Sequence, residues 1–345
     1  MIKNIQIIGF KCFDCVNLEL NNLTLLAGQN SKGKTTIIQA LLAMMQDGNN
    51  PFRGEYMNIG EPEELENVIV GSRKIEISVS YEKDEDVKKE TKTIENGKVA
   101  VEGNGLVSND IKVVYCSADR IGVKDTYEKY LGDEIIIGKN CEYAFHYLSE
   151  HGDETWNIEN DFIYDEESKL TFGGQVNYWL EKIIGYWVTA KKIDKTELVR
   201  VLYNNKLLYR DVRPKNVGTG VTYIAEVIIA ALSCKKGDLL IIENPEIHLH
   251  PSGQGELIKF LSYLAQWGVQ IIMETHSDHV YNGVRKGIHL DWIEHENVNI
   301  YFFTQKEDGC TIPVKIPLNS EGKALEHEDG LFDQIKKDLD VILGW

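Results

Sequence analysis

The sequence lacks the features that mark secreted, membrane-spanning and disulfide-stapled proteins. No run of residues approaches the roughly 18 apolar positions of a membrane span, and the first residues, MIKNIQIIGF, have no signal-peptide pattern. The six cysteines are scattered, and only Cys12 and Cys15 have CxxC spacing, without the second pair that a zinc site needs. We therefore expect free thiols and a cytoplasmic protein.

Basic residues are in short supply. Lys and Arg number 37 against 54 Asp and Glu, a net charge of −17, which opposes nonspecific attraction to nucleic acid or an anionic membrane. DNA stays open as a partner only through one local basic cluster, whose alternative explanation is charge balance: Lys191, Lys192, Lys195, Arg200, Arg210, Arg213 and Lys215. An acidic run over 150–167 is interpreted as a solvated surface or, alternatively, a docking patch. Its members are Glu150, Asp153, Glu154, Glu159, Asp161, Asp165, Glu166 and Glu167.

No repeat, low-complexity tract, Pro-rich linker or long coiled coil interrupts the chain, and its length predicts about two packing units. Three strand-like segments, IQIIGF, CVNLEL and LTLLAG, precede a predicted helix. From 74 to 101, apolar and polar residues alternate and the chain is predicted to turn at Asn96-Gly97, which indicates an antiparallel β layer. Residues 124–190 are predicted to be helical and irregular, and ELVRVLY and LLYRDV to form a hairpin around Asn204-Asn205. Strands then alternate with helices, which predicts an α/β fold with a mixed or parallel sheet.

The strongest motif spans Gly28 to Thr35 and fits GxxxxGK[ST] between a predicted strand and a helix. In such a loop the backbone N–H groups surround phosphate oxygens, Lys34 reaches the β/γ-phosphates and Thr35 is placed for Mg²⁺. The sequence therefore predicts ATP and Mg²⁺ as cofactors. The candidate nucleotide-binding residues here are Gly28, Gln29, Asn30, Ser31, Lys32, Gly33, Lys34, Thr35 and Thr36.

A second group of candidates lies in the C-terminal half. The buried run LLII ends at Glu243, which is typical of a Walker B element whose carboxylate holds Mg²⁺ together with Thr35. Before it, glycines precede a helix and offer another phosphate-binding N-terminus; the candidates are Gly218, Thr219, Gly220 and Thr222. After it, VQIIMETHSDH places His276 at a strand end, where an imidazole is suited to contact the γ-phosphate or the attacking water.

These motifs in this order resemble the ATP-binding-cassette class, in its soluble branch of RecF-, SMC- and OLD-like ATPases. Six sequence segments resemble those of the small OLD-related ATPases of bacterial phage-defence and genome-maintenance operons. They are IQIIGFKCF, LLAGQNSKGKTTIIQALL, SADRIG, VGTGV, ENPEIHLHP and ETHSDH. The ending GLFDQIKKDLDVIL looks like a C-terminal extension that some of them carry. The resemblance implies an N-terminal ATPase lobe (1–120), a mainly helical insertion (121–195) and a C-terminal ATPase lobe (196–345).

The resemblance also implies roles for individual residues. The degenerate signature Gly218 to Thr222 would close on the ATP of a second subunit, with its hydroxyl contact from Thr219 or Thr222. The candidate catalytic residues are Glu243, Asn244, Glu246 and His276. Asn244 stands where many relatives place the water-polarising glutamate, and Glu246 is a substitute. Ile247 to His250 would line the interface, and the His248/His250 pair is a weak metal cue. Arg120 resembles a recurrent arginine whose role stays open.

Together these features predict an ATPase, with slow hydrolysis on account of Asn244, that dimerises around ATP·Mg²⁺ and regulates a separately encoded effector such as a nuclease. No nuclease domain and no membrane partner is expected in this chain. Two alternatives remain: a nucleotide-gated scaffold with little turnover, which Asn244 motivates, and the motor subunit of a transporter, which the β-rich insertion and the altered signature disfavour.

Overall fold

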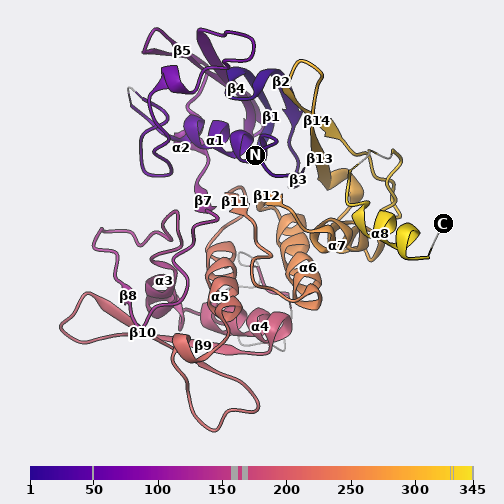
Figure 1. The fold of residues 1–345 in the computed structure, drawn as a ribbon. Helices are drawn as coiled ribbons and strands as arrows, with labels where there is room; N and C mark the ends of the chain where they lie inside the picture. Colours follow the sequence, from indigo (N-terminus) through magenta and orange to yellow (C-terminus); the bar gives the residue numbers. More distant parts are fainter. Residues whose placement is uncertain (49, 157–161, 165–169, 327, 329, 344–345) are drawn as a thin grey trace. The chain divides into compact units, whose positions relative to one another are not determined.

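The computed structural model describes all residues except 49, 157–161, 165–169, 327, 329 and 344–345. Its fold is α/β, with mixed and antiparallel sheets and helices, as predicted. The chain forms two compact units, unit 1 (Met1–Ile111 with Met273–Trp345) and unit 2 (Lys112–Ile272) (Figure 1). In the described part of the chain, no helix has the length and apolar character needed to cross a membrane.

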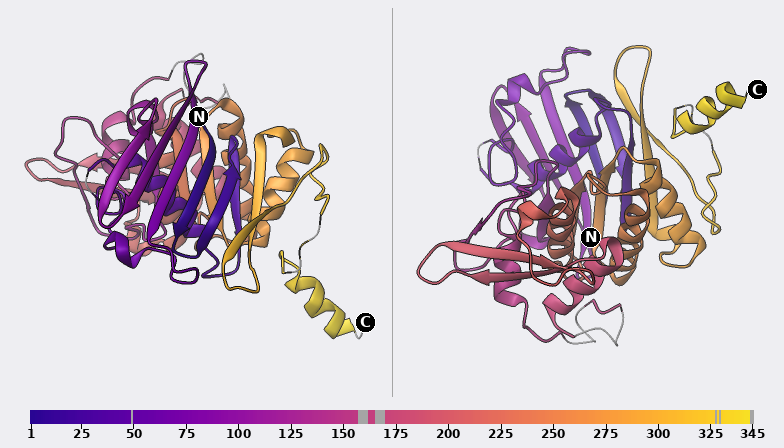
Figure 2. Two further views of the ribbon diagram at one scale, coloured as in Figure 1. Left: turned by 90° about the horizontal axis from the view of Figure 1, so that it is seen from above. Right: turned by 60° about the horizontal axis from the view of Figure 1, so that its bottom comes forward.

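Unit 1 contains a five-stranded antiparallel sheet with the order β2-β1-β4-β5-β6. Its strands lie side by side in the left view of Figure 2. They are β1 (Ile2–Phe10), β2 (Phe13–Glu19), β4 (Lys74–Lys83), β5 (Asp86–Glu95) and β6 (Lys98–Gly103). The predicted turn between β5 and β6 is confirmed: Asn96 and Gly97 both have positive φ angles, 49° and 68°, as a two-residue hairpin of this type requires.

A second sheet in unit 1 positions the phosphate loop. It contains β14 (Thr311–Lys315), β13 (Val298–Gln305), β3 (Leu23–Gly28) and the end of β12 (Gln270–Thr275), in that order. Strand β3 is buried along its whole length, as a strand between two others must be, and it runs parallel to β13. Helix α1 (Lys34–Met45) follows the loop and packs against β3 and β4.

The remaining elements of unit 1 are shorter or lie near its end. They are α2 (Val107–Asp110), α7 (Asp278–His289), α8 (Gln334–Leu343) and the 3-10 turns Pro62–Glu64 and His295–Asn297. Helix α7 begins after Ser277, whose hydroxyl caps the helix by accepting from the N–H groups of His279 and Val280. Helix α8 exposes the apolar side chains of Leu339, Val341, Ile342 and Leu343.

Unit 2 is built around a parallel strand pair, β7 (Val113–Cys116) and β11 (Leu239–Glu243). Its helices are α3 (Ala144–His151), α4 (Phe172–Ile184), α5 (Thr219–Leu232) and α6 (Pro251–Trp267), with a 3-10 turn at Pro214–Asn216. Helix α4 packs against α5 and α6, and the buried Trp179 lies with its ring 4.8 Å from that of Phe260. The predicted helix over VNYWLEKIIGYW is therefore part of the core of this unit.

A small antiparallel sheet in unit 2 corrects one expectation and limits another. It has the order β8-β10-β9, with β8 (Tyr127–Glu128), β10 (Leu198–Asn204) and β9 (Trp187–Lys192), so the region 124–190 includes strands that the sequence did not predict. The predicted hairpin between ELVRVLY and LLYRDV is confirmed only as a single antiparallel bridge, in which the backbones of Tyr203 and Val212 exchange two hydrogen bonds of 2.8 Å. The continuous partner of β10 is β9. The side-chain oxygen of Asn205 accepts from the N–H groups of Leu207 and Leu208, which closes a local turn at the start of LLYRDV.

Candidate functional site

The phosphate loop runs from the end of β3 to the start of α1, and two glycines are required for its shape. Gly28 has a φ of 138°, and a Cβ there would lie 3.2 Å from the backbone N and O of Phe303. Gly33, the N-cap of α1, is left-handed with a φ of 85°, and a Cβ there would lie 2.7 Å from Cys12 Sγ. The first turn of α1 contains no acidic residue of its own, and the partial positive charge of this helix N-terminus favours a phosphate.

Lys34 and Thr35 occupy the first turn of α1. The Lys34 side chain is only 3% exposed, and its Nζ donates to the carbonyl oxygens of Gly28 and Gln29 at 3.0 and 2.8 Å. Lys32 is turned outward and donates to Gln305 Oε1, while Asn30 and Ser31 are exposed. Thr36 is buried beside Cys12. The ammonium group of Lys34 is thus held at the loop that the motif assigns to phosphates.

Glu274, near the end of β12, is the carboxylate next to Thr35. The Thr35 hydroxyl lies 3.1 and 2.8 Å from its two carboxylate oxygens, and Lys34 Nζ lies 3.9 Å from Oε1. His276 Nε2 is 3.9 Å from the same oxygen, at the carboxyl end of the strand. A hydroxyl and a carboxylate in contact are the hard oxygen ligands that Mg²⁺ prefers, so these residues fit the metal that a phosphate loop uses.

In unit 2, Glu243 ends β11 with both carboxylate oxygens already bonded. Oε1 accepts from the Tyr115 hydroxyl at 2.9 Å, and Oε2 accepts from the Ala118 N–H at 3.0 Å. Burial raises the pKa of Glu243 above its ordinary value, and the two hydrogen bonds act in the opposite direction. The strand end predicted as a Walker B element is therefore a buried carboxylate tied to the neighbouring strand β7 and its following loop.

Arg120 ties the same strand end to the SADRIG loop. Its guanidinium donates to the carbonyl oxygens of Ser117 and Glu243 at 3.0 and 2.8 Å and to that of Asn244 at 2.9 Å. Asn244 takes a left-handed backbone conformation, with a φ of 45°, directly after the strand. Arg120 therefore fixes the backbone on which Glu243 and Asn244 stand, and Glu246 follows half-buried.

The signature segment divides into an exposed and a buried part. Gly218 caps α5 and Thr219 begins it, and both are exposed. Gly220 is buried, and a Cβ there would lie 2.5 Å from the carbonyl oxygen of His248 in the same unit. The Thr222 side chain is completely buried, so its hydroxyl does not face outward. Of the two hydroxyls considered for a phosphate contact, that of Thr219 is the accessible one.

The histidines after the Walker B strand have different settings. His248 is exposed, and its ring lies 5.2 Å from that of Tyr223 on α5. His250 caps α6, and its Nδ1 accepts from the backbone N–H of Ser252 at 3.3 Å. Within the described residues, no group of three or more His, Cys, Asp or Glu side chains is arranged to hold a metal ion.

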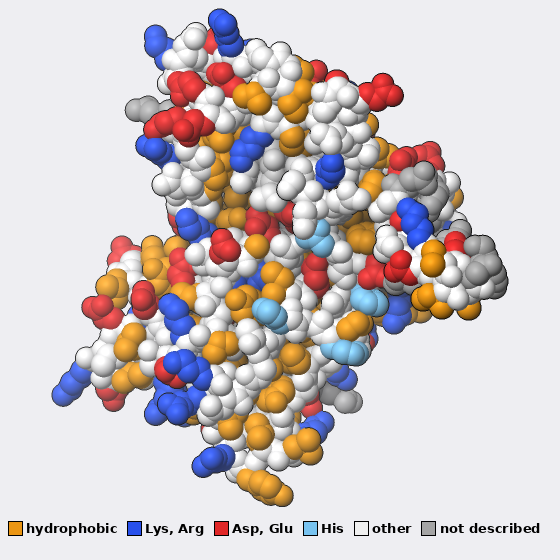
Figure 3. All heavy atoms as spheres, viewed as in Figure 1, with side chains coloured by type: hydrophobic (Ala, Val, Ile, Leu, Met, Phe, Trp, Pro, Cys, Tyr) orange, Lys and Arg blue, Asp and Glu red, His pale blue; other side chains and the backbone are white. Residues whose placement is uncertain are grey.

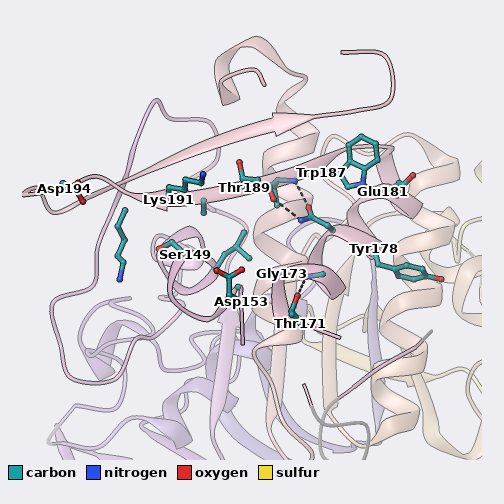
Figure 4. A pocket seen from close by; sticks show the side chains of 17 residues that line it. Ser149, Asp153, Thr171, Gly173, Tyr178, Glu181, Trp187, Thr189, Lys191 and Asp194 are labelled. Carbon is teal, nitrogen blue, oxygen red and sulfur yellow. Dashed lines mark hydrogen bonds between the residues drawn. The ribbon is translucent and has the colours of Figure 1, made fainter. Parts of the chain in front are cut away.

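The basic cluster and its surroundings carry mixed charge. Lys192 forms an ion pair with Glu150 and Lys215 one with Asp125, and Figure 3 shows basic and acidic side chains together in this region. A pocket of about 1000 Å³ lies beside β9, and Figure 4 shows Lys191 and Asp194 at one end and Tyr178 and Glu181 at the other. Glu154 pairs with His151, whereas Glu159, Asp161, Asp165, Glu166 and Glu167 lie outside the described residues.

Sequence reasoning missed Glu274, Tyr115 and the bonding role of Arg120. The signal for Glu274 was present: it interrupts the strand QIIMET, in which Ile271, Ile272 and Met273 have no exposed surface. A carboxylate at such a position is costly unless it has partners. The partners are Thr35 and Lys34, far away in the sequence, so no local pattern could name them.

A loop that follows a buried strand and opens a helix with a buried Lys and a Thr defines a P-loop nucleotide-binding protein. A family model described as "AAA ATPase domain" matches residues 1–172 and 209–281, and the chain belongs to this family. A second model, described as "Protein of unknown function (DUF3696)", matches residues 293–342. No curated protein matches the sequence.

Solved structures with a similar fold include heads of SMC proteins. An SmcHead bound to the C-winged helix domain of ScpA has a TM-score of 0.60 and 13% identity, covering 92% of this chain and 98% of that one. A Pyrococcus furiosus Smc head domain bound to the C-terminal domain of ScpA has a TM-score of 0.59 and 11% identity, covering 99% of both chains. The SMC head domain from Thermotoga maritima has a TM-score of 0.50 and 11% identity, covering 91% of this chain and 98% of that one. The fold expected from the resemblance is thereby confirmed.

Proposed function

We propose that this protein binds ATP with Mg²⁺ at the phosphate loop and hydrolyses the nucleotide slowly. The observation that carries the proposal is the arrangement at the start of α1, where Lys34 Nζ lies on the loop and the Thr35 hydroxyl lies against a carboxylate. A buried ammonium group offsets the charge of a triphosphate, and loop N–H groups at a helix N-terminus add to it. Bound Mg²⁺ would neutralise charge that develops on the phosphate oxygens.

Hydrolysis further requires a group that orients water, and the assigned candidates are Glu243, Asn244, Glu246 and His276. His276 is partly exposed at the carboxyl end of β12 in unit 1, close to Glu274. Asn244 has no charge with which to take up a proton, which is why turnover should be slow. The alternative, a scaffold that binds ATP but turns over little, is favoured by the same residue. Single-turnover phosphate release separates the two: release in the wild type that Lys34→Ala lacks supports the ATPase.

We further propose that ATP drives two copies of the chain together. The exposed start of α5, at Gly218 and Thr219, offers N–H donors and a partial positive charge to the γ-phosphate of a second copy. ADP lacks that phosphate, so ATP and ADP should favour different assemblies. Gly220 is less suited to testing this, because a side chain there would first meet His248 within its own unit.

Gly218 offers the cleaner experiment. A Cβ at this position meets no atom within 4 Å, and Asp and Asn are both good N-caps, so neither substitution should harm the fold. Gly218→Asp adds a charge that repels phosphate, whereas Gly218→Asn adds the same bulk without it. In sedimentation with ATP·Mg²⁺, we expect the Asn variant to assemble as the wild type does and the Asp variant to stay small. Equal assembly of both variants contradicts this part of the proposal.

The biological setting that we propose follows the OLD-like resemblance: a switch subunit that controls a separate effector in phage defence or DNA maintenance. In this setting a nuclease is a separately encoded partner of the switch, as the resemblance implies. A co-purification experiment tests this proposed role. Proteins that co-purify with Glu243→Gln only when ATP is present would be candidates for the effector. A partner set that does not change with nucleotide argues against a nucleotide-controlled effector.

A further inference from the structure

Glu274 stands in an environment that a carboxylate occupies only with compensation. It is 4% exposed and follows three residues of β12 that are fully buried and apolar, so its charged form is expensive without partners. The compensation comes from the phosphate loop of the same unit. Both oxygens lie within hydrogen-bonding distance of the Thr35 hydroxyl, and the Lys34 ammonium is 3.9 Å away.

Glu243, which its position in the motif assigns to the metal, is engaged differently. Its oxygens accept from the Tyr115 hydroxyl and the Ala118 N–H, and Arg120 holds its backbone. These contacts fasten the end of β11 to β7 and the loop after it. A carboxylate whose two oxygens already serve as structural acceptors has less capacity left for a metal or its water ligands.

We propose that Glu274 is the metal-positioning carboxylate of the nucleotide site. Its carboxylate accepts a hydrogen bond from the Thr35 hydroxyl, which orients that group so that its oxygen lone pairs face Mg²⁺. The negative charge of Glu274 balances the cation. This inference rests on the proposed binding of ATP with Mg²⁺. It assigns the metal-positioning carboxylate to β12, whereas the sequence motif predicts it at the end of β11.

The proposal has an electrostatic signature that a purely structural role lacks. Without a metal, the Glu274 carboxylate opposes a triphosphate at the same loop; with Mg²⁺, it joins the phosphates in attracting the cation. Removing its charge should therefore strengthen or preserve metal-free ATP binding and weaken the coupling between Mg²⁺ and ATP. A side chain that only held the fold together would weaken both.

The experiment titrates a fluorescent, non-hydrolysable ATP analogue in EDTA and then titrates Mg²⁺ at fixed analogue. For Glu274→Gln we expect unchanged or tighter binding in EDTA and a rise of about 10–100-fold in the Mg²⁺ concentration for half-saturation, the usual effect of removing a metal-supporting partner. The matched variant Glu243→Gln should raise the Mg²⁺ requirement clearly less than Glu274→Gln does, because the Glu243 oxygens are engaged by Tyr115 and Ala118. The proposal is overturned if Glu274→Gln needs the same Mg²⁺ concentration as the wild type. It is also overturned if the rise of about 10–100-fold in the Mg²⁺ concentration occurs in Glu243→Gln instead.

Two further measurements keep the result clear. The melting temperature of Glu274→Gln shows whether this variant folds. If it does not fold, Glu274→Asp takes its place; it keeps the charge on a shorter side chain and should show a smaller rise in the Mg²⁺ requirement. The absence of any rise in Glu274→Asp counts against the proposal. The wild type and Lys34→Ala report on the underlying function. If the wild type fails to bind the analogue, the proposed function itself falls, whereas intact Lys34-dependent binding with no effect at Glu274 removes only this inference.

Discussion

The carboxylates Glu243 and Glu274 lie at or near the carboxyl ends of two consecutive strands, β11 and β12, yet their surroundings differ. In unit 1, Glu274 faces the Thr35 hydroxyl and the Lys34 ammonium, both from the phosphate loop. In unit 2, Glu243 faces a tyrosine hydroxyl and a backbone N–H, and its pKa is raised by burial. The comparison teaches that the position of a carboxylate in a sequence motif does not by itself tell which groups it contacts.

The largest expected effect is on ATP binding at the phosphate loop of unit 1. Lys34→Ala should weaken ATP binding by about 100-fold or more, because a desolvated triphosphate loses its charged hydrogen-bond donor. Fluorescence titration of a labelled ATP analogue measures this. Lys32→Ala is the matched control. The Lys32 ammonium donates to Gln305 Oε1 at an exposed position, so its removal should change the affinity little. Equal affinities of the two variants would remove the phosphate-loop assignment.

The next effect concerns the unit 2 side. Arg120→Ala leaves the carbonyl oxygens of Ser117, Glu243 and Asn244 without their charged donor, and should lower the free energy of unfolding of this unit by about 3 kcal/mol. Urea unfolding followed by tryptophan fluorescence measures it, because Trp179 is buried in unit 2. Arg200→Ala, an exposed position on β10, is the control. A midpoint in Arg120→Ala like that of the control would show that the three hydrogen bonds contribute little.

A smaller effect separates the buried from the exposed part of the signature. Gly220→Ala places a Cβ 2.5 Å from the His248 carbonyl oxygen and should cost about 1–3 kcal/mol through overpacking, even without nucleotide. Gly218→Ser meets open space and places a preferred N-cap residue before α5, so it should cost no more than a few tenths of a kcal/mol. Thermal unfolding of the two variants tests the difference. Similar melting temperatures would mean that the start of α5 is not packed against His248.

The smallest effect is a dependence on pH in unit 2. Burial raises the pKa of Glu226 well above its ordinary value, as it does for Glu243 to a lesser degree. The folded state therefore holds a proton that the unfolded state releases, so the free energy of unfolding should fall as pH rises from about 4.5 through the raised pKa. Glu226→Gln, whose amide oxygen keeps the acceptor for the Gly122 N–H, should reduce this slope and be more stable at neutral pH.

The control for that prediction is Glu102→Gln, an exposed position on β6. Melting temperatures at several pH values should show the wild-type slope in this variant and a flatter slope in Glu226→Gln. Identical slopes in all three proteins would mean that Glu226 does not hold its proton on folding.

Much of unit 1 was predictable because its signals are local. The alternation in β1 and β4, the Asn96-Gly97 turn and the glycines of the loop each act over a few residues, and the structure follows them. The small sheet of unit 2 was not predictable in the same way. Strand β10 pairs along its length with β9 and at one end with β8, whereas its predicted hairpin partner contributes only the bridge between Tyr203 and Val212. The turn pattern therefore indicated a real contact but not the main partner of the strand.

The candidate site shows the same division. The motif identified Lys34 and Thr35 and the strand that ends at Glu243, since spacing and hydrophobic runs are visible in the sequence. It left open whether Thr219 or Thr222 is accessible and what Arg120 contacts, because both depend on packing. Glu274 was overlooked since its contact with Thr35 joins residues at opposite ends of the chain.

The central claim is that Thr35 and Glu274 act together in binding Mg²⁺. A double-mutant cycle tests this claim most directly. The Mg²⁺ concentration for half-saturation, at fixed ATP analogue, is measured for the wild type, Thr35→Val, Glu274→Gln and the double variant. If Glu274 works through the Thr35 hydroxyl, the double variant should be only slightly worse than the worse single variant, far short of the product of the two changes. Fully multiplicative effects would show that the two residues act independently and would contradict the account.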